Sequence, residues 1–225
     1  MLIEFKNIFV DREGRQTLAD LSLSLSEHRV GIIGPNGSGK STLIRLINGL
    51  LMPQLGQVRV DGLDTRHDVE KIRSKVGFVF QNPDNQIVFP VVSEDIAFGL
   101  KRRVPDPEDR RHRASDALTQ LGILHLQDRL IHTLSGGERQ LVALAGVLAI
   151  QPDILVFDEP TTQLDLRFRN RFERHLCALS QPAVIVSHDL ALMHTMERVL
   201  VLKDGRLAFD GPPAAATSWY RTHCG

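Results

Sequence analysis

A glycine-rich stretch in the first quarter of the chain has the residue types that bind phosphate groups. Residues Gly34–Ser41 fit the spacing G-x-x-x-x-G-K-[ST]. Glycines let backbone N–H groups approach phosphate oxygens, and the start of a following helix adds the positive end of its dipole. We expect Lys40 to meet the β- and γ-phosphates and the Ser41 hydroxyl to bind Mg²⁺. The predicted phosphate site comprises Asn36, Gly37, Ser38, Gly39, Lys40, Ser41 and Thr42.

Two carboxylates follow a short apolar run later in the chain. Residues Ile154–Phe157 lead directly into Asp158 and Glu159. A buried strand that ends in carboxylates places them at the sheet edge where α/β proteins bind ligands. Asp158 is then suited to hold Mg²⁺, and Glu159 to activate a water for attack on a γ-phosphate. Taken alone, the pair is also compatible with two solvated acids after a strand.

A third motif, Leu134–Gln140, reads Leu-Ser-Gly-Gly-Glu-Arg-Gln. Ser135 and Glu138 have the S-x-x-E spacing of a capping box at the start of a helix. A capped helix start that includes two glycines can bind a second anion. The capping box alone would equally be explained by a purely structural helix cap.

The elements around these motifs alternate between short apolar runs and helical patterns, which favours an α/β fold with a largely parallel central sheet. A helix is expected after Ser41, and a hairpin is expected around Asp204-Gly205. Asp106-Pro107 is a good helix start within a helical stretch between Gln81 and Gln151. We expect the ordered pattern to end at Pro212-Pro213. Core strands are predicted at residues 30–33, 76–80, 154–157 and 183–186.

Composition limits the classes of protein that this chain could be. It has 225 residues, 27 basic and 27 acidic residues, and 42% hydrophobic residues. The balanced charge argues against neutralisation of a nucleic-acid backbone as the main task. No apolar run approaches the roughly 18 residues needed to span a bilayer. Two cysteines make no disulfide framework, so we expect a reducing, cytoplasmic location.

In the order and spacing of these motifs, the chain resembles the ATP-binding subunits of ABC transporters over about residues 2–211. Gly34–Thr42 is similar to the Walker A motif, Ile154–Glu159 to Walker B, and Leu134–Gln140 to the signature motif. Gln81 stands where that family has its Q-loop glutamine, and His188 where it has its switch histidine. A histidine after a strand is more often structural, but this position beside the Walker B strand favours the functional interpretation.

The resemblance implies a fold and a set of partners. The fold would be a phosphate-loop NTPase with a RecA-like parallel core sheet, an N-terminal antiparallel β subdomain and an inserted α-helical subdomain. All 225 residues would form one ABC ATPase domain. Its ATP-binding core would span residues 1–81 and 152–211, its helical signature subdomain about 82–151, and a short tail 212–225. Two protomers, forming a homodimer, would bind two ATP molecules head to tail.

The resemblance also implies residue roles. Glu159 would be the general base, His188 would hold the γ-phosphate, and Gln81 would reach Mg²⁺ and the attacking water. Ser135 and Gly137 would contact the ATP bound to Lys40 of the other protomer. The metal ligands would be Ser41, Gln81 and Asp158.

Two positions depart from the family pattern. The family has an aromatic residue that stacks on adenine where this chain has Asp11 and Arg12. Phe9 or the flat guanidinium of Arg12 could substitute for it. The family also has a small residue before the Leu-Asp of its D-loop, where this chain has Gln163.

The segment from Gln81 to Pro90 is similar to that of the ATPases of energy-coupling-factor importers for cobalt, nickel and vitamins. Such an ATPase is an ABC-type translocase that is peripheral to the cytoplasmic face of the membrane. It pairs with a transmembrane coupling protein and a substrate-binding membrane protein, and no nucleic acid is implied. Many of these ATPases carry a C-terminal extension that does not appear in these residues. The short form is most similar to the biotin-importer ATP-binding subunit.

Rival functions make different demands on the sequence. A soluble ABC ATPase of DNA repair or translation would need a long coiled-coil insertion or two tandem ATPase units. A phosphate-loop switch or kinase would need an Asn-Lys-x-Asp motif or a second substrate lid.

The segment that follows Gln81 contains apolar residues in what is predicted to be a loop, namely Ile87, Val88, Phe89 and Val91. They either form a groove for a helix of the coupling protein or pack under the helical subdomain.

Overall fold

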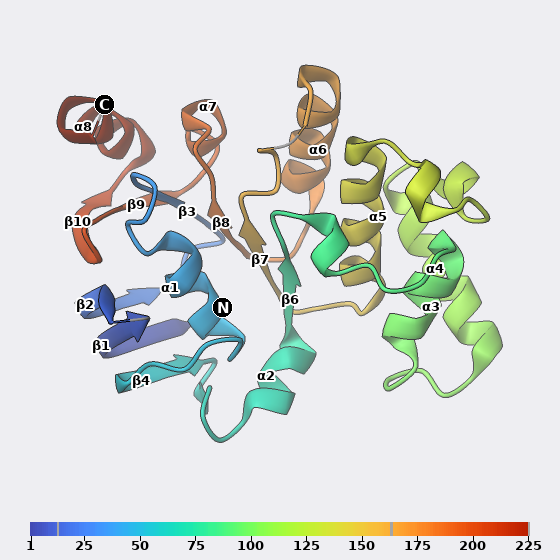
Figure 1. Cartoon of the computed structure of the whole chain (residues 1–225), viewed down its shortest axis with the longest axis horizontal. Coiled ribbons are helices and arrows are strands. Elements are labelled where there is room, and N and C mark those ends of the chain that lie inside the picture. The colour runs from blue at the N-terminus through green and yellow to red at the C-terminus, as the bar shows by residue number, and fades with distance from the viewer. Residues whose placement is uncertain (13, 163, 225) are drawn as a thin grey trace. The chain divides into compact units, whose positions relative to one another are not determined.

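The computed structural model describes residues 1–12, 14–162 and 164–224. The chain forms two compact units, shown together in Figure 1. Residues 1–78, 153–159 and 180–225 make one unit, here called the α/β unit. Residues 79–152 and 160–179 make the other, the helical unit. The division into an ATP-binding core and a helical signature subdomain stays a prediction.

The α/β unit contains a four-stranded sheet in the order β2-β1-β4-β5. All its neighbouring strands are antiparallel, as the fold class predicts for an N-terminal β subdomain. Side chains of β1 alternate between buried and accessible positions, because successive residues of a strand point to opposite faces. The strands are β1 (Ile3–Arg12), β2 (Arg15–Leu25), β4 (Leu55–Val60) and β5 (Leu63–Asp64).

The second sheet has six strands in the order β10-β9-β3-β8-β7-β6. Strand β3 is parallel to β8 and β9, and β7 is parallel to β8. Every residue of β3, β6, β7 and β8 is buried, as expected for a parallel sheet covered on both faces. The strands are β3 (Arg29–Ile33), β6 (Val76–Val79), β7 (Ile154–Asp158), β8 (Ala183–Val186), β9 (Arg198–Lys203) and β10 (Arg206–Gly211). The predicted core strands are therefore confirmed within a residue or so.

The predicted hairpin is confirmed as well. Strands β9 and β10 pair antiparallel, and Asp204 and Gly205 form the two-residue loop between them. Both loop residues have positive φ angles, 49° and 74°. A turn of this kind matches the twist of the flanking strands and favours an Asp-Gly pair.

Helix α1 (Lys40–Ile47) lies between the two sheets and contacts β2 and β4 of one and β7 and β8 of the other (Figure 1). Its buried stripe includes Leu43, Leu46 and Ile47, so the helix expected after Ser41 is confirmed. Leu50 lies beyond the end of the helix and is exposed. The other helices of this unit are α2 (Val69–Lys75), α7 (Leu190–Met193) and α8 (Pro213–Cys224).

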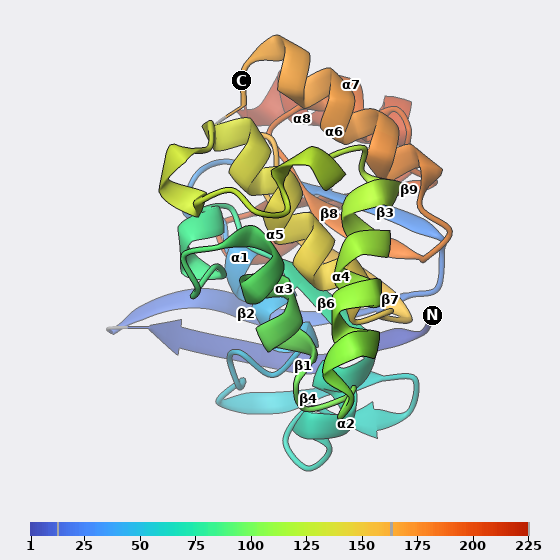
Figure 2. The ribbon, with the colours of Figure 1, turned by 90° about the vertical axis from the view of Figure 1, so that its right-hand side faces the viewer.

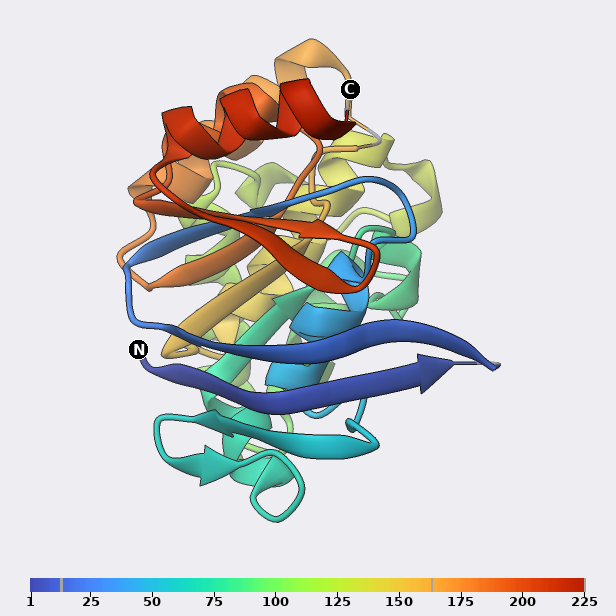
Figure 3. The same cartoon turned by 90° about the vertical axis from the view of Figure 1, so that its left-hand side faces the viewer.

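The expectation that the ordered pattern ends at Pro212-Pro213 is wrong. Helix α8 begins at Pro213, a residue type that suits the first turn of a helix because its missing N–H would be unpaired there anyway. The helix packs across the β9–β10 hairpin (Figure 3). The rings of Trp219 and Phe209 of β10 lie 6.1 Å apart, which anchors α8 on the sheet.

The helical unit is built on α3, α4, α5 and α6, with α4 running beside α5 (Figure 2). Helix α4 begins at Pro107, and the Asp106 carboxylate accepts a hydrogen bond from the N–H of Asp109, which confirms the predicted cap. The helices are α3 (Val92–Leu100), α4 (Pro107–Gln120), α5 (Gly136–Ala149) and α6 (Leu166–Ala178), with short 3₁₀ turns η1 (Pro83–Asn85), η2 (Leu124–Leu126) and η3 (Ile131–Thr133). No helix in the described parts of the chain is both long and apolar enough to cross a lipid bilayer.

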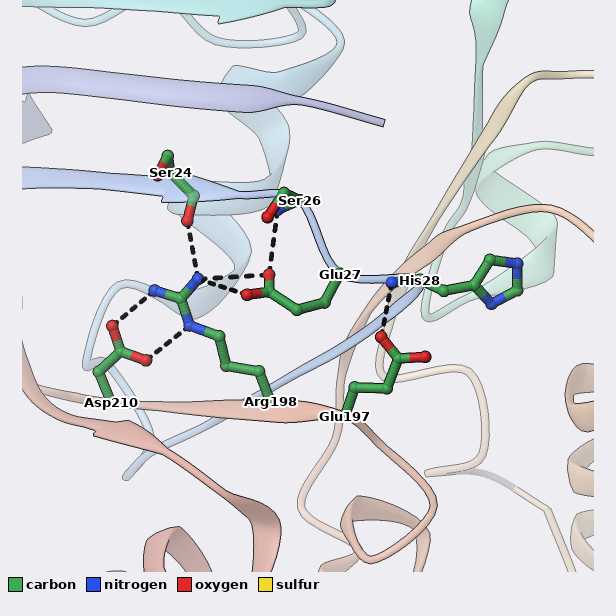
Figure 4. Close-up of polar contacts among 7 residues, drawn as sticks. All are labelled: Ser24, Ser26, Glu27, His28, Glu197, Arg198 and Asp210. Carbon is green, nitrogen blue, oxygen red and sulfur yellow. Dashed lines mark hydrogen bonds and ion pairs between the residues drawn. The ribbon is translucent and has the colours of Figure 1, made fainter.

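A cluster of charged side chains joins the two sheets of the α/β unit at the link between β2 and β3 (Figure 4). Arg198 of β9 donates to both oxygens of Asp210 on β10 and of Glu27 in the link. It also donates to the carbonyl of Ser24 at the end of β2, at 2.9 Å. Because charge-assisted contacts of this kind are directional, Arg198 fixes the link that precedes β3 and hence the phosphate loop after it.

Candidate nucleotide site

The predicted phosphate loop lies between β3 and α1, as the motif requires. Gly34 and Gly39 have φ angles of 157° and 100°, a region that other residues rarely adopt. A Cβ atom on Gly34 would collide with the carbonyl oxygen of Leu202, and one on Gly39 would lie 2.7 Å from that of Thr17. Glycine is therefore needed at both positions for the loop to pass so close to β9 and β2.

The loop encloses a cavity of about 200 Å³ lined by Thr17, Asn36–Thr42 and Glu159. The Lys40 ammonium donates to the carbonyls of Gly34 at 2.8 Å and Pro35 at 3.0 Å. The Ser38 hydroxyl is buried, and it has no hydrogen-bond partner among the described residues. A buried hydroxyl without a partner is costly unless a ligand supplies one. The structure thus brings Asn36–Thr42 together with Glu159 around one cavity.

The charged side chain of Lys40 is buried. Burial lowers the pKa of Lys40 from its usual 10.5, and the carboxylates of Glu159 and Asp158 only partly offset this effect. A cation that loses solvation on burial is stabilised by any anion that comes close. The cavity beside Lys40 is therefore suited to bind phosphate.

Asp158 at the end of β7 is held by two side chains of α1. The Ser41 hydroxyl donates to its Oδ1 at 2.7 Å, and the Arg45 guanidinium lies 3.3 Å from its Oδ2. The Asp158 side chain is only 2% exposed. The structure therefore brings together the two predicted metal ligands Ser41 and Asp158.

Glu159 and His188 are also in contact. The Nε2 atom of His188 lies 2.8 Å from Oε1 of Glu159, a hydrogen-bond distance. Strands β7 and β8 are parallel neighbours with Asp158 opposite Val186, so the residues that follow them emerge at the same sheet edge. Glu159 has a φ of 48°, and its N–H donates to the carbonyl of Val186 at 3.0 Å. That hydrogen bond holds Glu159 in a backbone conformation that is sparsely populated for a residue with a side chain.

Three predicted site residues belong to the helical unit. Gln81 is exposed and lies two residues beyond the end of β6, which stops at Val79 rather than at residue 80. Ser135 caps α5 with the predicted capping box: Glu138 N–H donates to the Ser135 hydroxyl, and the Glu138 carboxylate accepts from Ser135 N–H at 2.8 Å. A Cβ atom on Gly137 would collide with the Phe168 ring of α6, so glycine is required there.

Arg12 lies at the end of β1 and does not line the cavity. It is on the same face of β1 as the buried Val10, because residues two apart in a strand share a face. The Arg12 side chain is exposed, and Phe9, on the opposite face, is half-buried, so the strand turns neither of them fully into the core of the unit. The predicted D-loop departure, Gln163, lies outside the described residues.

Two residues at this site, Thr17 and Arg45, lie outside every predicted motif. Thr17 of β2 lines the cavity, and nothing in its local sequence pattern marks it. Arg45 contacts Asp158, and here a signal existed: Ser41 and Arg45 are four residues apart, so they lie on one face of α1.

Comparison with known proteins agrees with this geometry. The family model described as "ABC transporter" matches residues 18–162. The biotin transport ATP-binding protein BioM of Rhizobium etli is 48% identical over 221 residues, which cover 98% of each chain.

Two solved structures are similar along almost the whole chain. The first is cbiO1 of Clostridium perfringens, described as part of the ABC transporter complex cbiONQ. It is 31% identical with a TM-score of 0.85, covering 98% of this chain and 92% of that one. The second is the ATP-binding cassette MJ0796, in a dimeric post-hydrolysis state bound to ADP and Pi. It is 30% identical with a TM-score of 0.83, covering 94% of this chain and 98% of that one. The phosphate loop, the carboxylates after β7 and these similarities lead to one conclusion: the chain belongs to the ABC transporter family, whose ATP-binding proteins are ATPases coupled to transport.

Proposed function

We propose that this protein is the ATP-hydrolysing subunit of an energy-coupling-factor importer that takes up a micronutrient. The similarity to a biotin transport ATP-binding protein and to a component of the cbiONQ complex supports this branch of the family. The cargo would be a vitamin such as biotin, or cobalt or nickel. The subunit would sit at the cytoplasmic face of the membrane, bound to membrane proteins that carry the substrate.

The observation that carries the proposal is the meeting of Ser41, Asp158, Glu159 and His188 around the phosphate loop. Phosphoryl transfer demands mainly positioning and stabilisation of charge. In our proposal Lys40 neutralises the β- and γ-phosphates, and the backbone N–H groups of Asn36–Gly39 hold their oxygens. Ser38 and Thr42 add hydroxyl groups to the same phosphate site.

The residues present fit Mg²⁺. Ser41 and Asp158 offer hydroxyl and carboxylate oxygens, the hard donors that this ion prefers. The described residues include no cluster of three or more His, Cys, Asp or Glu side chains that could hold a metal alone. A site with so few protein ligands is suited to Mg²⁺, which usually binds one or two protein groups together with nucleotide phosphates and water. When bound, Mg²⁺ would neutralise phosphate charge, and Gln81 would complete its protein ligands.

Glu159 and His188 would act on the attacking water and the γ-phosphate. The imidazole N–H of His188 can donate to Glu159 and so orient its carboxylate. Glu159 would then accept a proton from the water that attacks the γ-phosphate. His188, whose side chain is 38% exposed, would also hold the γ-phosphate itself.

We further propose that two copies of the chain sandwich two ATP molecules. Ser135 and Gly137 would contact the nucleotide bound to Lys40 of the other copy, because the N-terminus of α5 offers unpaired N–H groups to an anion. The dimeric state of the similar cassette MJ0796 supports this arrangement. Arg12 would lie against the adenine.

The membrane partner would dock on an apolar surface of the helical unit. Val88, Phe98 and Leu130 are 72%, 48% and 43% exposed. The rings of Phe98 and Phe89 are in contact at a tilt of 40°, with centroids 4.6 Å apart, and Val91 pairs with Leu130, so these segments are joined. The alternative that the loop packs in the interior is wrong for Val88. A short helix of a coupling protein would cover such a surface.

Two substitutions test the proposed site. Glu159→Gln keeps the size of the side chain but removes the base, so ATP turnover should fall roughly 10²–10⁴-fold. ATP binding should persist, and light scattering after gel filtration should show a dimer that appears only with ATP and Mg²⁺. Lys40→Ala should lose ATP binding and should remain a monomer. Glu70→Gln, the same change at an exposed position of α2, serves as the control. Full turnover by Glu159→Gln would refute the assigned base, and full ATP binding by Lys40→Ala would refute the phosphate site.

A further inference from the structure

Asp158 is a buried carboxylate whose two oxygens have separate partners. Oδ1 accepts a hydrogen bond from Ser41, and Oδ2 is paired with Arg45. An ionised carboxylate at 2% exposure is strongly destabilising unless it is paired. Arg45 is the cation in contact with this carboxylate, whereas Lys40, which acts on Asp158 only through its charge, donates its hydrogen bonds to backbone carbonyls.

Helix geometry explains why both partners come from α1. Ser41 and Arg45 are separated by four residues and therefore lie one above the other on the same face of the helix. The two contacts are made to different oxygens of one carboxylate, so they restrict its rotation about the Cβ–Cγ bond. Arg45 thus fixes the plane of the Asp158 carboxylate while one of its oxygens stays on Ser41.

Arg45 does not line the phosphate cavity. The lining of the phosphate cavity includes Lys40, Ser41 and Thr42 of α1 but not Arg45. The Arg45 side chain is 37% exposed, so its guanidinium keeps part of its hydration while it contacts the buried acid. Any effect of Arg45 on the site must therefore pass through Asp158.

We propose that Arg45 is a positioning residue for the magnesium site, which it prepares by holding one oxygen of Asp158 and so keeping the other oriented toward Ser41. This inference rests on the proposed function, because it takes Ser41 and Asp158 to be the residues that receive Mg²⁺. Partners of this outer kind orient the groups that bind a metal, and their loss weakens metal affinity roughly 10–100-fold.

Arg45→Met tests the proposal by removing the charge while keeping a long side chain. The Mg²⁺ concentration that gives half-maximal ATPase activity should rise about 10-fold or more. Binding of a fluorescent ATP analogue in EDTA should be unchanged, because Lys40 and the loop are intact. The added affinity that Mg²⁺ gives to this binding should shrink by a similar factor. Arg45→Lys restores a cation and should lie between the wild-type protein and Arg45→Met.

Arg73→Met is the matched control. Arg73 of α2 donates to the carbonyls of Asn48 and Gly49 just after α1, so it supports the end of the same helix. It should leave the Mg²⁺ requirement unchanged even if it lowers stability. An equal shift in Arg73→Met would mean that Arg45 acts only through the stability of α1, and would overturn the proposal.

Ser41→Ala and Asp158→Asn separate this inference from the proposed function. If neither changes the Mg²⁺ dependence of nucleotide binding, the metal site itself is wrong. If both change it while Arg45→Met leaves it the same or tighter, only the role of Arg45 is wrong. Should Arg45→Met fail to fold, Arg45→Lys carries the test, because a Mg²⁺ requirement equal to that of Arg73→Met would overturn the proposal.

Discussion

Single side chains at this site are defined by the contacts that they make with residues far away in the chain. Asp158 meets Ser41 across a separation of 117 residues, and Glu159 meets His188 at 2.8 Å. Each of these groups is ordinary by itself. Their proximity gives a carboxylate beside a hydroxyl and a carboxylate beside an imidazole, next to a buried lysine. That combination favours phosphoryl chemistry over a structural role for any one of them.

Arg12 is proposed to stack on the adenine of ATP, where the family has an aromatic residue. Stacking of a guanidinium on a base contributes about 0.5–1 kcal/mol at an exposed position, so Arg12→Ala should weaken ATP binding about 2–5-fold. Arg12→Tyr should restore the affinity, because an aromatic ring stacks on adenine at least as well. Calorimetric titration with ATP measures both changes.

Inorganic tripolyphosphate provides the control for Arg12, because it has the phosphates and no base. Its affinity should be the same for the Arg12→Ala variant and the unmodified protein. Phe9→Ala, on the other face of β1, should leave ATP binding unchanged. A loss of tripolyphosphate affinity in Arg12→Ala would show that Arg12 acts on the phosphates instead.

At the scale of elements, the proposed dimer depends on the start of α5, which would contact the nucleotide of the other copy. Ser135→Arg places a bulky cation there and removes a cap, at a cost of roughly 0.5–2 kcal/mol in stability. We expect the variant to fold, to bind ATP as a monomer through Lys40, and to lose ATPase activity.

Mixing Ser135→Arg with Lys40→Ala then tests the proposed geometry of the dimer. In a mixed dimer one site carries both changes and the other carries neither, so the mixture should show turnover that neither variant shows alone. Loss of ATP binding by Ser135→Arg in isolated protomers would mean that the residue acts on its own nucleotide, against the sandwich arrangement.

The link between β2 and β3 should make stability depend on pH. Burial raises the pKa of Glu27, but hydrogen bonds from the backbone and from Arg198 outweigh it and hold the pKa below its usual 4.5. A carboxyl group whose pKa is lowered by folding stabilises the folded protein when the pH is above its unfolded-state pKa. That stabilisation is lost as the pH falls through the folded-state pKa. Glu27→Gln should therefore be less stable near neutral pH, by about 1–2 kcal/mol. The difference should vanish in acid.

Urea unfolding in steps from about pH 7 to about pH 3 measures this effect. Glu4→Gln is the control, since Glu4 pairs with the exposed Lys6 and such surface pairs contribute about 0–1 kcal/mol. A stability difference for Glu27→Gln that stayed constant down to the acid end would show that its charge is not involved.

At the scale of the whole molecule, the exposed apolar surface around Val88 is the proposed docking site for the membrane partner. Val88→Asp should leave stability within about 0.5 kcal/mol of the original, because the side chain is 72% exposed. In the assembled importer the new charge would be buried without a partner. The variant should therefore no longer co-purify with the membrane subunits when these are expressed together.

Leu124→Asp, a similar change at another exposed position of the helical unit, should still co-purify. Assembly of Val88→Asp at normal yield would place the docking surface elsewhere. A large loss of thermal stability in the isolated Val88→Asp variant would instead indicate that Val88 packs within its own unit.

Much of this architecture could be predicted because it depends on local rules. The strands at residues 30–33, 154–157 and 183–186 are runs of apolar residues, and the turn at Asp204-Gly205 uses residue types that the turn requires. The capping box at Ser135 likewise depends on two residues only three apart. Helix α8 was missed because Pro212-Pro213 resembles a stop signal, although proline is equally suited to begin a helix.

The sequence by itself determined the phosphate loop and the carboxylates after β7, since each is a short run whose residue types depend on local backbone geometry. Only the tertiary structure decided which of these groups meet. The parallel pairing of β7 with β8 brings Glu159 to His188, and the packing of α1 between the two sheets brings Arg45 to Asp158. These contacts arise because a buried carboxylate must find a cation or a donor wherever the folded chain supplies one. The partner's position along the chain is free to vary, so no local pattern encodes it.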